Sequence, residues 1–400
     1  MDYCKYADPF YFVSNIGTAF NVDNITPNAL LPFGKMSAGV HPLKFGQGEG
    51  DKILTRGVSD FYHTETENGG HYYNYAVVTP FYGEISEITK FHIAKNQDAQ
   101  TGYYKMTMGD TDCEVTLSKD VIYHHCYFEK QNGRVAIDFS NDTLLKQPYV
   151  EITPLGEVLF SGTVSGEKLY FCALAECQNP KVTLFENLCE TEKKSITPDT
   201  KNHFGAIFDF DGNGIILKIA NSTLGFDDAK QKARSAIDSF DTVMNKAYAT
   251  WGKHLSRIEI ETESGEFKHK FYSAFYHILA NGVDITDGSF REFENDSLTF
   301  LKQFKEIQPF IFTAYREFSS KLTQRGEICA HCGEIFAYID KAVIHLENGN
   351  KLEIIVKKQS KESTYIDYIE FNGEKVEGNK LDFCEIVKGG ELVFSIIEKD

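Results

Sequence analysis

The sequence predicts a mainly β protein with a helical segment, an α+β chain in which strands occupy both ends. Short segments rich in β-branched and aromatic residues follow one another through the first half of the chain. A helical period replaces them after about Leu224, and the strand pattern returns beyond Gly333. Many short strands with few helical patterns between them favour a sandwich over an α/β sheet.

Glycine-containing turn signals separate the strands of the first half. One stands at Gln131–Gly133 and another at Asp211–Gly214. From Asp209 the second copies half of an EF-hand loop, but Ala220 occupies the twelfth position, where a bidentate Glu belongs. We therefore expect a hairpin turn there and no metal site. The strands expected are Glu114–Ser118, Val135–Phe139, Leu169–Leu174, Ala206–Phe210 and Ile215–Ile219.

The middle of the chain has the period of amphipathic helices. From Asp227 to His254 apolar residues recur at spacings of three and four, which predicts one helix capped by Asp227 or Asp228. Further expected elements are a strand at Arg257–Glu261, a helix through Phe267 to Ile278, and a helix at about Leu298–Leu322 that Pro309 kinks or divides.

The C-terminal part again has strand patterns. Ala342–Leu346 and Leu352–Val356 flank an Asn-Gly turn and predict a hairpin, and Tyr365–Phe371 and Glu391–Ser395 continue the pattern. These changes of period predict three parts: an N-terminal β-sandwich over 1–224, a helical part over 225–325 and a C-terminal β region over 326–400.

The composition excludes some partners. Lys and Arg total 41 against 58 for Asp and Glu, a net charge of -17, so nucleic acid is not expected as a partner. No apolar run approaches the roughly 18 residues of a membrane span, and no membrane association is expected. The first residues lack a secretory pattern, and nine scattered cysteines favour reduced thiols, so we expect a cytoplasmic location.

Five segments stand in a distinctive order along the chain: Val13–Thr18, Pro27–Met36, Lys218–Leu224, Phe271–His277 and Val343–Gly349. In sequence and order they resemble segments of glycoside hydrolase family 92, the exo-α-mannosidase family. The resemblance implies a galactose-mutarotase-like supersandwich in the N-terminal part, followed by a short helical remnant and a C-terminal β region.

The resemblance also predicts what this chain lacks. In the family, an α/α barrel of several hundred residues lies between the blocks matched by His277 and Val343, and it supplies the general acid, the general base and the calcium ligands. Fewer than seventy residues fill that interval here. Thr299–Lys305 stands where the family has Ser-Leu-Trp-Asp-Thr-Phe-Arg, so Leu301 and Lys302 replace the sugar-facing Trp and Asp. We therefore expect a truncated member without most of the barrel.

The remaining candidate site residues form two acidic groups. One matches an Asp-rich loop of the family, although a solvated acidic loop is the favoured explanation; the other surrounds a histidine near the N-terminus. Cys329 and Cys332 have zinc-knuckle spacing but no second pair, so a junction loop is expected unless Cys384 or His345 completes a site. The weak catalytic candidates are Asp284, Asp287, Glu65 and Glu67, and the ligand-binding candidates are His63, Glu65 and His71.

Two classes of function remain. The favoured class is a non-catalytic carbohydrate-binding or interaction protein. The alternative is an inverting, α-mannosidase-like glycosidase with a rebuilt site, which needs two carboxyl groups about 6.5–9.5 Å apart. No cofactor is expected, with calcium as the alternative. A homodimer is a further option, because removal of the barrel would expose a docking surface that self-association can cover.

Overall fold

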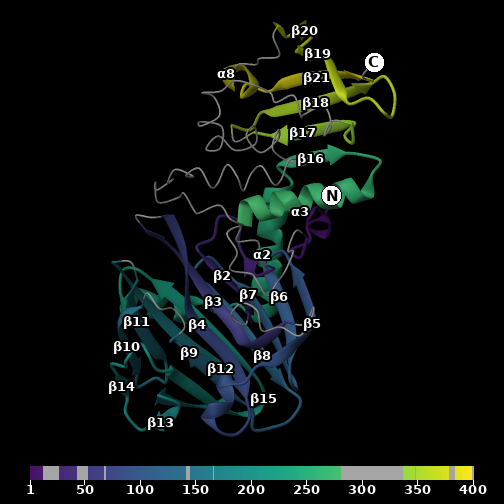
Figure 1. Ribbon diagram of the computed structural model, residues 1–400. Helices are drawn as coiled ribbons and strands as arrows, with labels where there is room; N and C mark the ends of the chain where they lie inside the picture. The colour runs from purple at the N-terminus through teal and green to yellow at the C-terminus, as the bar shows by residue number, and fades with distance from the viewer. Residues whose placement is uncertain are drawn as a thin grey trace. The chain divides into compact units, whose positions relative to one another are not determined.

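The computed structural model describes residues 1–11, 27–42, 53–66, 69–140, 145–164, 166–280, 337–346, 348–377 and 383–398. It divides into two compact units, one of residues 12–250 with 280–290 and one of residues 1–11, 251–279 and 291–400 (Figure 1). Strands dominate both units, which confirms the mainly β class with a helical segment. No helix in the described ranges combines the length and apolar character needed to cross a membrane.

The larger unit is organised by one sheet, which has 15 strands within the described residues. Its hydrogen-bonded order is β1-β2-β3-β5-β6-β7-β8-β15-β12-β11-β10-β14, and β13 pairs with β12. Strand β4 pairs with β3 and β9, and β9 pairs with β15. The hydrogen-bonded strands therefore form a closed ladder in the order β3-β5-β6-β7-β8-β15-β9-β4, in which β4 pairs again with β3. The bounds are β1 Ala29–Leu30, β2 Met36–Pro42, β3 Leu54–Thr66, β4 Gly69–Phe81, β5 His92–Gln100, β6 Tyr103–Met108, β7 Thr111–Leu117, β8 Val121–Phe128, β9 Arg134–Asp138, β10 Lys146–Ile152, β11 Val158–Val164, β12 Glu167–Glu186, β13 Cys189–Thr191, β14 Ser195–Ile196 and β15 Phe204–Ser222.

Strand β15 joins the two halves of this closed ladder. Its first half pairs with β9 and its second half pairs with β8, while β12 runs beside both halves. The predicted hairpin turn at Asp211–Gly214 is therefore wrong, because the chain continues as one strand. Opposite Gln178 the register slips, and Gly212 adopts a φ of +93°. The glycine-rich segment forms a bulge where the strand changes partners.

Stacked aromatic rings fill the core of the larger unit. Tyr75 lies 4.1 Å from Phe171, and Phe139 lies 4.2 Å from Phe160, both nearly parallel. Phe160 and Phe171 join the two pairs at 5.5 Å. All four rings are buried. The sheet is thus held by side chains from β4, β11 and β12 and from the residue that follows β9.

Two helices follow the sheet: α1 (Phe226–Ser235) and α2 (Phe240–Leu255). The single helix predicted from Asp227 to His254 is wrong, because the chain breaks at Ala236, whose carbonyl oxygen accepts a hydrogen bond from Lys218 Nζ at 2.6 Å. Gly225, with a φ of +147°, is the N-cap instead of an aspartate. Asp227 and Asp228 lie in the first turn, where their negative charges interact favourably with the positive end of the helix dipole.

The smaller unit has a sheet of six strands within its described residues, in the order β16-β17-β18-β21-β19-β20. The predicted hairpin is confirmed as β17 and β18, with Gly349 at a φ of +87° in its turn. The predicted helix at Leu298–Leu322 lies outside the described residues. The bounds are η1 Cys4–Tyr6, β16 Ile258–Glu261, α3 Gly265–Ala280, β17 Lys341–His345, β18 Lys351–Lys358, β19 Tyr365–Phe371, β20 Glu374–Lys375, α8 Phe383–Ile386 and β21 Gly390–Ile397.

Helix α3 supplies much of the core of the smaller unit. Tyr276 of α3 lies 4.4 Å from Trp251, the only tryptophan of the sequence, and both rings are fully buried. Tyr272 packs against Tyr3 of the N-terminal segment and donates a hydrogen bond to the carbonyl oxygen of Ile258. These contacts tie the first residues of the chain and β16 to one helix.

Candidate functional site

The predicted ligand-binding residues lie in one hairpin. Strands β3 and β4 pair His63 with Tyr72, Thr64 with His71 and Glu65 with Gly70, so the register brings these backbones close together. The side chains of His63, Glu65 and His71 lie outside the described part of the structure. Their proposed role stays a prediction. The same applies to Glu67, Asp284 and Asp287, which lie outside the described residues altogether.

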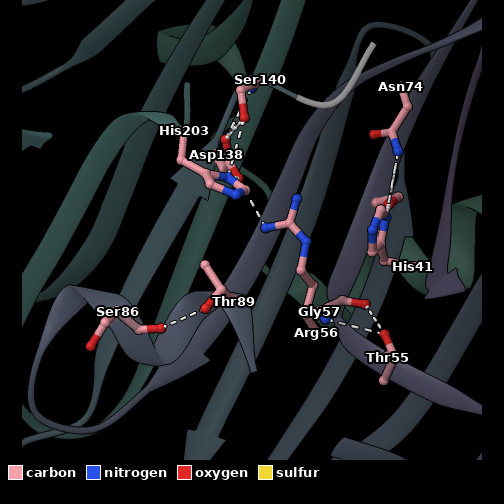
Figure 2. Close-up of polar contacts among 11 residues, drawn as sticks. His41, Thr55, Arg56, Gly57, Asn74, Ser86, Thr89, Asp138, Ser140 and His203 are labelled. Carbon is pink, nitrogen blue, oxygen red and sulfur yellow. Dashed lines mark hydrogen bonds and ion pairs between the residues drawn. The ribbon is translucent and has the colours of Figure 1, made fainter. Parts of the chain in front are cut away.

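A polar cluster joins the start of β3 to the end of β9 (Figure 2). Asp138, at the end of β9, accepts hydrogen bonds from Arg56 Nη1 at 2.9 Å, from His203 Nδ1 at 2.7 Å and from the Ser140 hydroxyl at 2.6 Å. Burial alone would raise the pKa of the Asp138 carboxyl. The His203 hydrogen bond and the Arg56 charge outweigh burial and hold that pKa well below its usual range. Asp138 is therefore ionised throughout the physiological range.

Two glycines allow the strands to approach one another at this cluster. Gly205 of β15 is the register partner of Asp138, and a Cβ there would lie 1.8 Å from the carbonyl oxygen of Ile137. A Cβ on Gly57, next to Arg56, would lie 2.3 Å from the carbonyl oxygen of Val78. Any larger residue would push the strands apart. The positions of Asp138 and Arg56 thus depend on these two glycines.

A second group joins β2, β3 and β4. His41 Nδ1 lies 2.6 Å from the Ser59 hydroxyl, and the Asn74 amide donates to the same hydroxyl at 3.3 Å (Figure 2). Burial, with the Arg56 charge, lowers the pKa of His41 to about 3, so the ring is neutral at pH 7. A neutral histidine beside a serine suggests a nucleophile. However, Ser59 has no exposed surface, so no substrate reaches its hydroxyl.

A third group contains a second buried carboxyl. Asp60 Oδ1 lies 2.8 Å from His124 Nε2, and Asp60 Oδ2 accepts a hydrogen bond of 3.4 Å from Tyr75. Burial raises the pKa of Asp60, against the opposing effect of His124. Asp60 and Asp138 thus have pKa values moved in opposite directions, the pattern of a glycosidase acid and base. Both side chains are 0% exposed, so neither touches a substrate.

Sequence reasoning missed these two carboxyls. Each is one acid inside an apolar strand segment, and Asp138 falls within the predicted strand Val135–Phe139. An acid in such a run is the available signal of a buried polar partner, because a lone buried charge is costly. The sequence does not identify the partner, since Arg56 lies 82 residues away.

The metal-like motifs fall into different surroundings. Asp209 of the EF-hand-like segment pairs with Arg134 at 2.6 Å, and Asp211 accepts a hydrogen bond from Asn179. His345 pairs with Glu259 at 2.6 Å, whereas Cys329 and Cys332 lie outside the described residues. Within the ranges the structure describes, no group of three or more His, Cys, Asp or Glu residues could hold a metal ion.

The smaller unit shows how the shortened interval is bridged. Strands β16 and β17 are direct antiparallel neighbours, with Ile258 opposite Ile344 and Glu261 opposite Lys341. The residues that follow His277 therefore belong to the connection from β16 to β17, and Val343 is part of β17 itself. Strands β16 and β17 are thus neighbours in the sheet, and fewer than seventy residues separate His277 from Val343.

Comparisons with known proteins agree with this architecture. A model described as "Glycosyl hydrolase family 92 catalytic domain" matches residues 228–325 and 337–398. The family GH92 α-mannosidase BT3965 from Bacteroides thetaiotaomicron superposes with a TM-score of 0.71 at 12% identity, covering 99% of this chain and 94% of that chain. The family GH92 inverting mannosidase BT2199 from Bacteroides thetaiotaomicron VPI-5482 gives 0.71 at 11% identity, covering 99% and 96%.

A third structure, the gh92 family glycosyl hydrolase ccman5, gives a TM-score of 0.72 at 12% identity, covering 100% of this chain and 98% of that chain. At such identities the structures establish a shared fold. No curated protein matches the chain. The family model and the shared fold together confirm the resemblance predicted from the sequence and support a carbohydrate-related protein.

Proposed function

As a relative of glycoside hydrolase family 92 that keeps the family's β-rich frame, this chain is, we propose, a non-catalytic glycan-binding protein. The length of one interval is the observation on which the proposal depends, because fewer than seventy residues separate His277 from Val343. In the family the interval between His277 and Val343 holds the barrel that supplies the acid and the base. Here that interval is a short connection between neighbouring strands, too short for a barrel of several hundred residues.

The buried carboxyls of the larger unit support the same proposal. Hydrolysis with inversion needs one carboxylic acid at the leaving oxygen and one carboxylate on a water molecule, both in contact with the substrate. Asp60 and Asp138 have suitably opposed pKa values but no exposed surface. Their hydrogen bonds are made to other side chains of the larger unit, where they stabilise the fold.

The partners and location follow from the composition. We propose a carbohydrate ligand and no nucleic acid, because the net charge is -17. A cytoplasmic location is supported by the free thiols of Cys113, Cys126, Cys172, Cys177 and Cys189. Size-exclusion chromatography with light scattering would distinguish a homodimer from a monomer.

Calorimetry and a turnover assay test the proposed function. Methyl α-D-mannopyranoside and an α-linked mannobiose are titrated into the protein, with calcium and after treatment with EDTA, and released mannose is measured in parallel. We expect weak, saturable binding and no mannose release. Saturable release that disappears in the Asp284→Asn or Asp287→Asn variant would show a working hydrolase and overturn the proposal. Absence of binding to any member of a glycan panel would also overturn it.

A further inference from the structure

An exposed aromatic ring lies on the face of the larger sheet formed by β7, β8 and β15. Tyr127 of β8 is 53% exposed, although β8 is a central strand with neighbours on both sides. Its register partner on β15 is Gly214, and its register partner on β7 is Asp112. One edge of the ring therefore faces a position without a side chain.

A histidine borders the same position. His125 lies two residues before Tyr127, so both side chains emerge on the same face of the strand. A Cβ built on Gly214 would lie 3.8 Å from His125 Nε2 and 3.8 Å from Cδ2 of Tyr127. Gly214 thus forms the floor of a shallow recess between the imidazole nitrogen and the phenol ring. We call the recess bounded by His125, Tyr127 and Gly214 the Tyr127 notch.

Neighbouring groups fix the orientation of the histidine. Its Nδ1 lies 3.1 Å from Glu114 Oε2, and Glu114 Oε1 accepts a hydrogen bond of 2.8 Å from Tyr103. The His125 hydrogen bond is the main cause that lowers the pKa of Glu114, so this carboxylate is ionised and accepts Nδ1–H. Phe240 packs on the imidazole at 5.6 Å between ring centres. Nε2, the other ring nitrogen, is therefore left beside the notch, where it can form a hydrogen bond with a ligand.

The other polar group of the notch is a carboxylate. Asp112 Oδ1 accepts the Thr107 hydroxyl at 2.7 Å, and the second oxygen belongs to a half-buried side chain next to Tyr127. Lys105 Nζ lies 3.8 Å from Glu114, so this cation has a carboxylate partner of its own. The notch therefore offers an apolar ring flanked by an imidazole nitrogen and a carboxylate oxygen. This combination suits a neutral ligand with an apolar face and hydroxyl groups along its edge, because a hydroxyl both donates and accepts hydrogen bonds.

We propose that the Tyr127 notch binds one neutral pyranose ring, such as the terminal residue of a glycan. The C–H face of the sugar packs on the Tyr127 ring, one hydroxyl forms a hydrogen bond with His125 Nε2, and a second donates to Asp112. The net charge of -17 disfavours anionic sugars, and an apolar peptide would leave both polar groups without hydrogen-bond partners. This assignment rests on the proposed function, and it places the glycan site at the Tyr127 notch.

Three substitutions in the notch test this assignment in the full chain. Methyl pyranosides of mannose, glucose and galactose, and a panel of neutral glycans, are titrated by calorimetry and by saturation-transfer NMR. Tyr127→Ala and Gly214→Ala should each weaken binding by roughly tenfold or more. Tyr127→Phe should retain binding, because the ring and not its hydroxyl contacts the sugar. The methyl group of Gly214→Ala fills the notch at ordinary contact distances, so this variant should keep its native circular dichroism.

A matched control is Tyr365→Ala, which removes a 44% exposed tyrosine from the smaller unit and should leave affinity unchanged. If folded Tyr127→Ala and Gly214→Ala proteins bind glycans as tightly as the unmodified protein, the notch is refuted while glycan binding stands. If the unmodified protein binds no sugar, both the notch and the proposed function are refuted. If Tyr127→Ala and Gly214→Ala lose binding while Tyr365→Ala keeps it, both the notch and the proposed function are supported.

Discussion

Replacement of Asp138 by Asn removes a buried negative charge and leaves the shape of the side chain nearly unchanged. In the folded protein the Asp138 carboxylate accepts hydrogen bonds from Arg56, His203 and Ser140. The side chains of Asp138 and Arg56 are 0% and 8% exposed, respectively. The substitution therefore leaves a buried guanidinium without its carboxylate partner.

The expected loss follows from this burial. Removal of one partner from a buried ion pair costs about 3–5 kcal/mol. His203 adds little, because its side chain is 38% exposed and solvent weakens its interaction. We expect Asp138→Asn to lower the free energy of unfolding by about 4 kcal/mol, which is a large share of the roughly 5–15 kcal/mol of a typical domain.

The same residue predicts a dependence on pH. The folded pKa of Asp138 lies below the unfolded value of about 3.9, so its contribution is complete above that value. Below about pH 4 the unfolded chain binds the proton more readily, and the contribution falls as pH decreases toward the folded pKa. Asp138→Asn should therefore weaken the acid sensitivity of unfolding in this range.

Urea denaturation followed by far-UV circular dichroism measures the effect, because most strands lie in the same unit as Asp138. The urea midpoint should fall, while the slope of the free energy of unfolding against urea concentration stays unchanged. Asp110→Asn is the matched control: its partner Lys130 is 2.6 Å away, but both side chains are largely exposed, so the midpoint should hardly move. Equal midpoints for Asp138→Asn and the unmodified protein would refute the account of the buried pair.

Three further outcomes are expected. Burial lowers the pKa of His277 to about 4, below the unfolded value of about 6.5, so stability should fall by about 2 kcal/mol between pH 7 and pH 5; His277→Gln should flatten this slope in tryptophan fluorescence, and an unchanged slope would contradict the assignment. Gly205→Ala should lower the free energy of unfolding by about 2 kcal/mol or more, because its methyl group meets a backbone oxygen, whereas Gly214→Ala on the same strand should not. Equal urea midpoints for the two variants would count against this packing. Cys189→Ser should remove one rapidly labelled thiol, whereas buried Cys172, whose pKa burial raises to about 12, should label only on unfolding; rapid labelling of Cys172 would disprove its burial.

Local patterns predicted the strands well where each strand has its own turn. Gln131–Gly133 separates β8 from β9, with Asn132 at a φ of +65°, and an Asn-Gly turn separates β17 from β18. The prediction failed at Asp211–Gly214, because a glycine-rich bulge and a hairpin turn have similar sequences. Only the partners of β15 distinguish them, and those partners lie far away along the chain.

The candidate site was less accessible to prediction for the same reason. Family resemblance drew attention to His63 and Glu65, whose role stays a prediction. The groups that the structure brings together come from distant segments: Arg56 meets Asp138 across 82 residues, and His203 meets it across 65. A residue-level pattern shows that an acid lies in an apolar strand, but not which base neutralises it.

The closed ladder of the larger unit has a consequence for synthesis on the ribosome. Strand β15 is the last strand of this ladder in the sequence, and it pairs with β8, β9 and β12. Until Ser222 has left the exit tunnel, β8 and β9 therefore lack one of their neighbours and present unpaired backbone groups. Such nascent edges are prone to associate with other chains. A slow translation rate through β12 would lengthen this period, and a chaperone that shields β8 and β9 would raise the yield of folded protein.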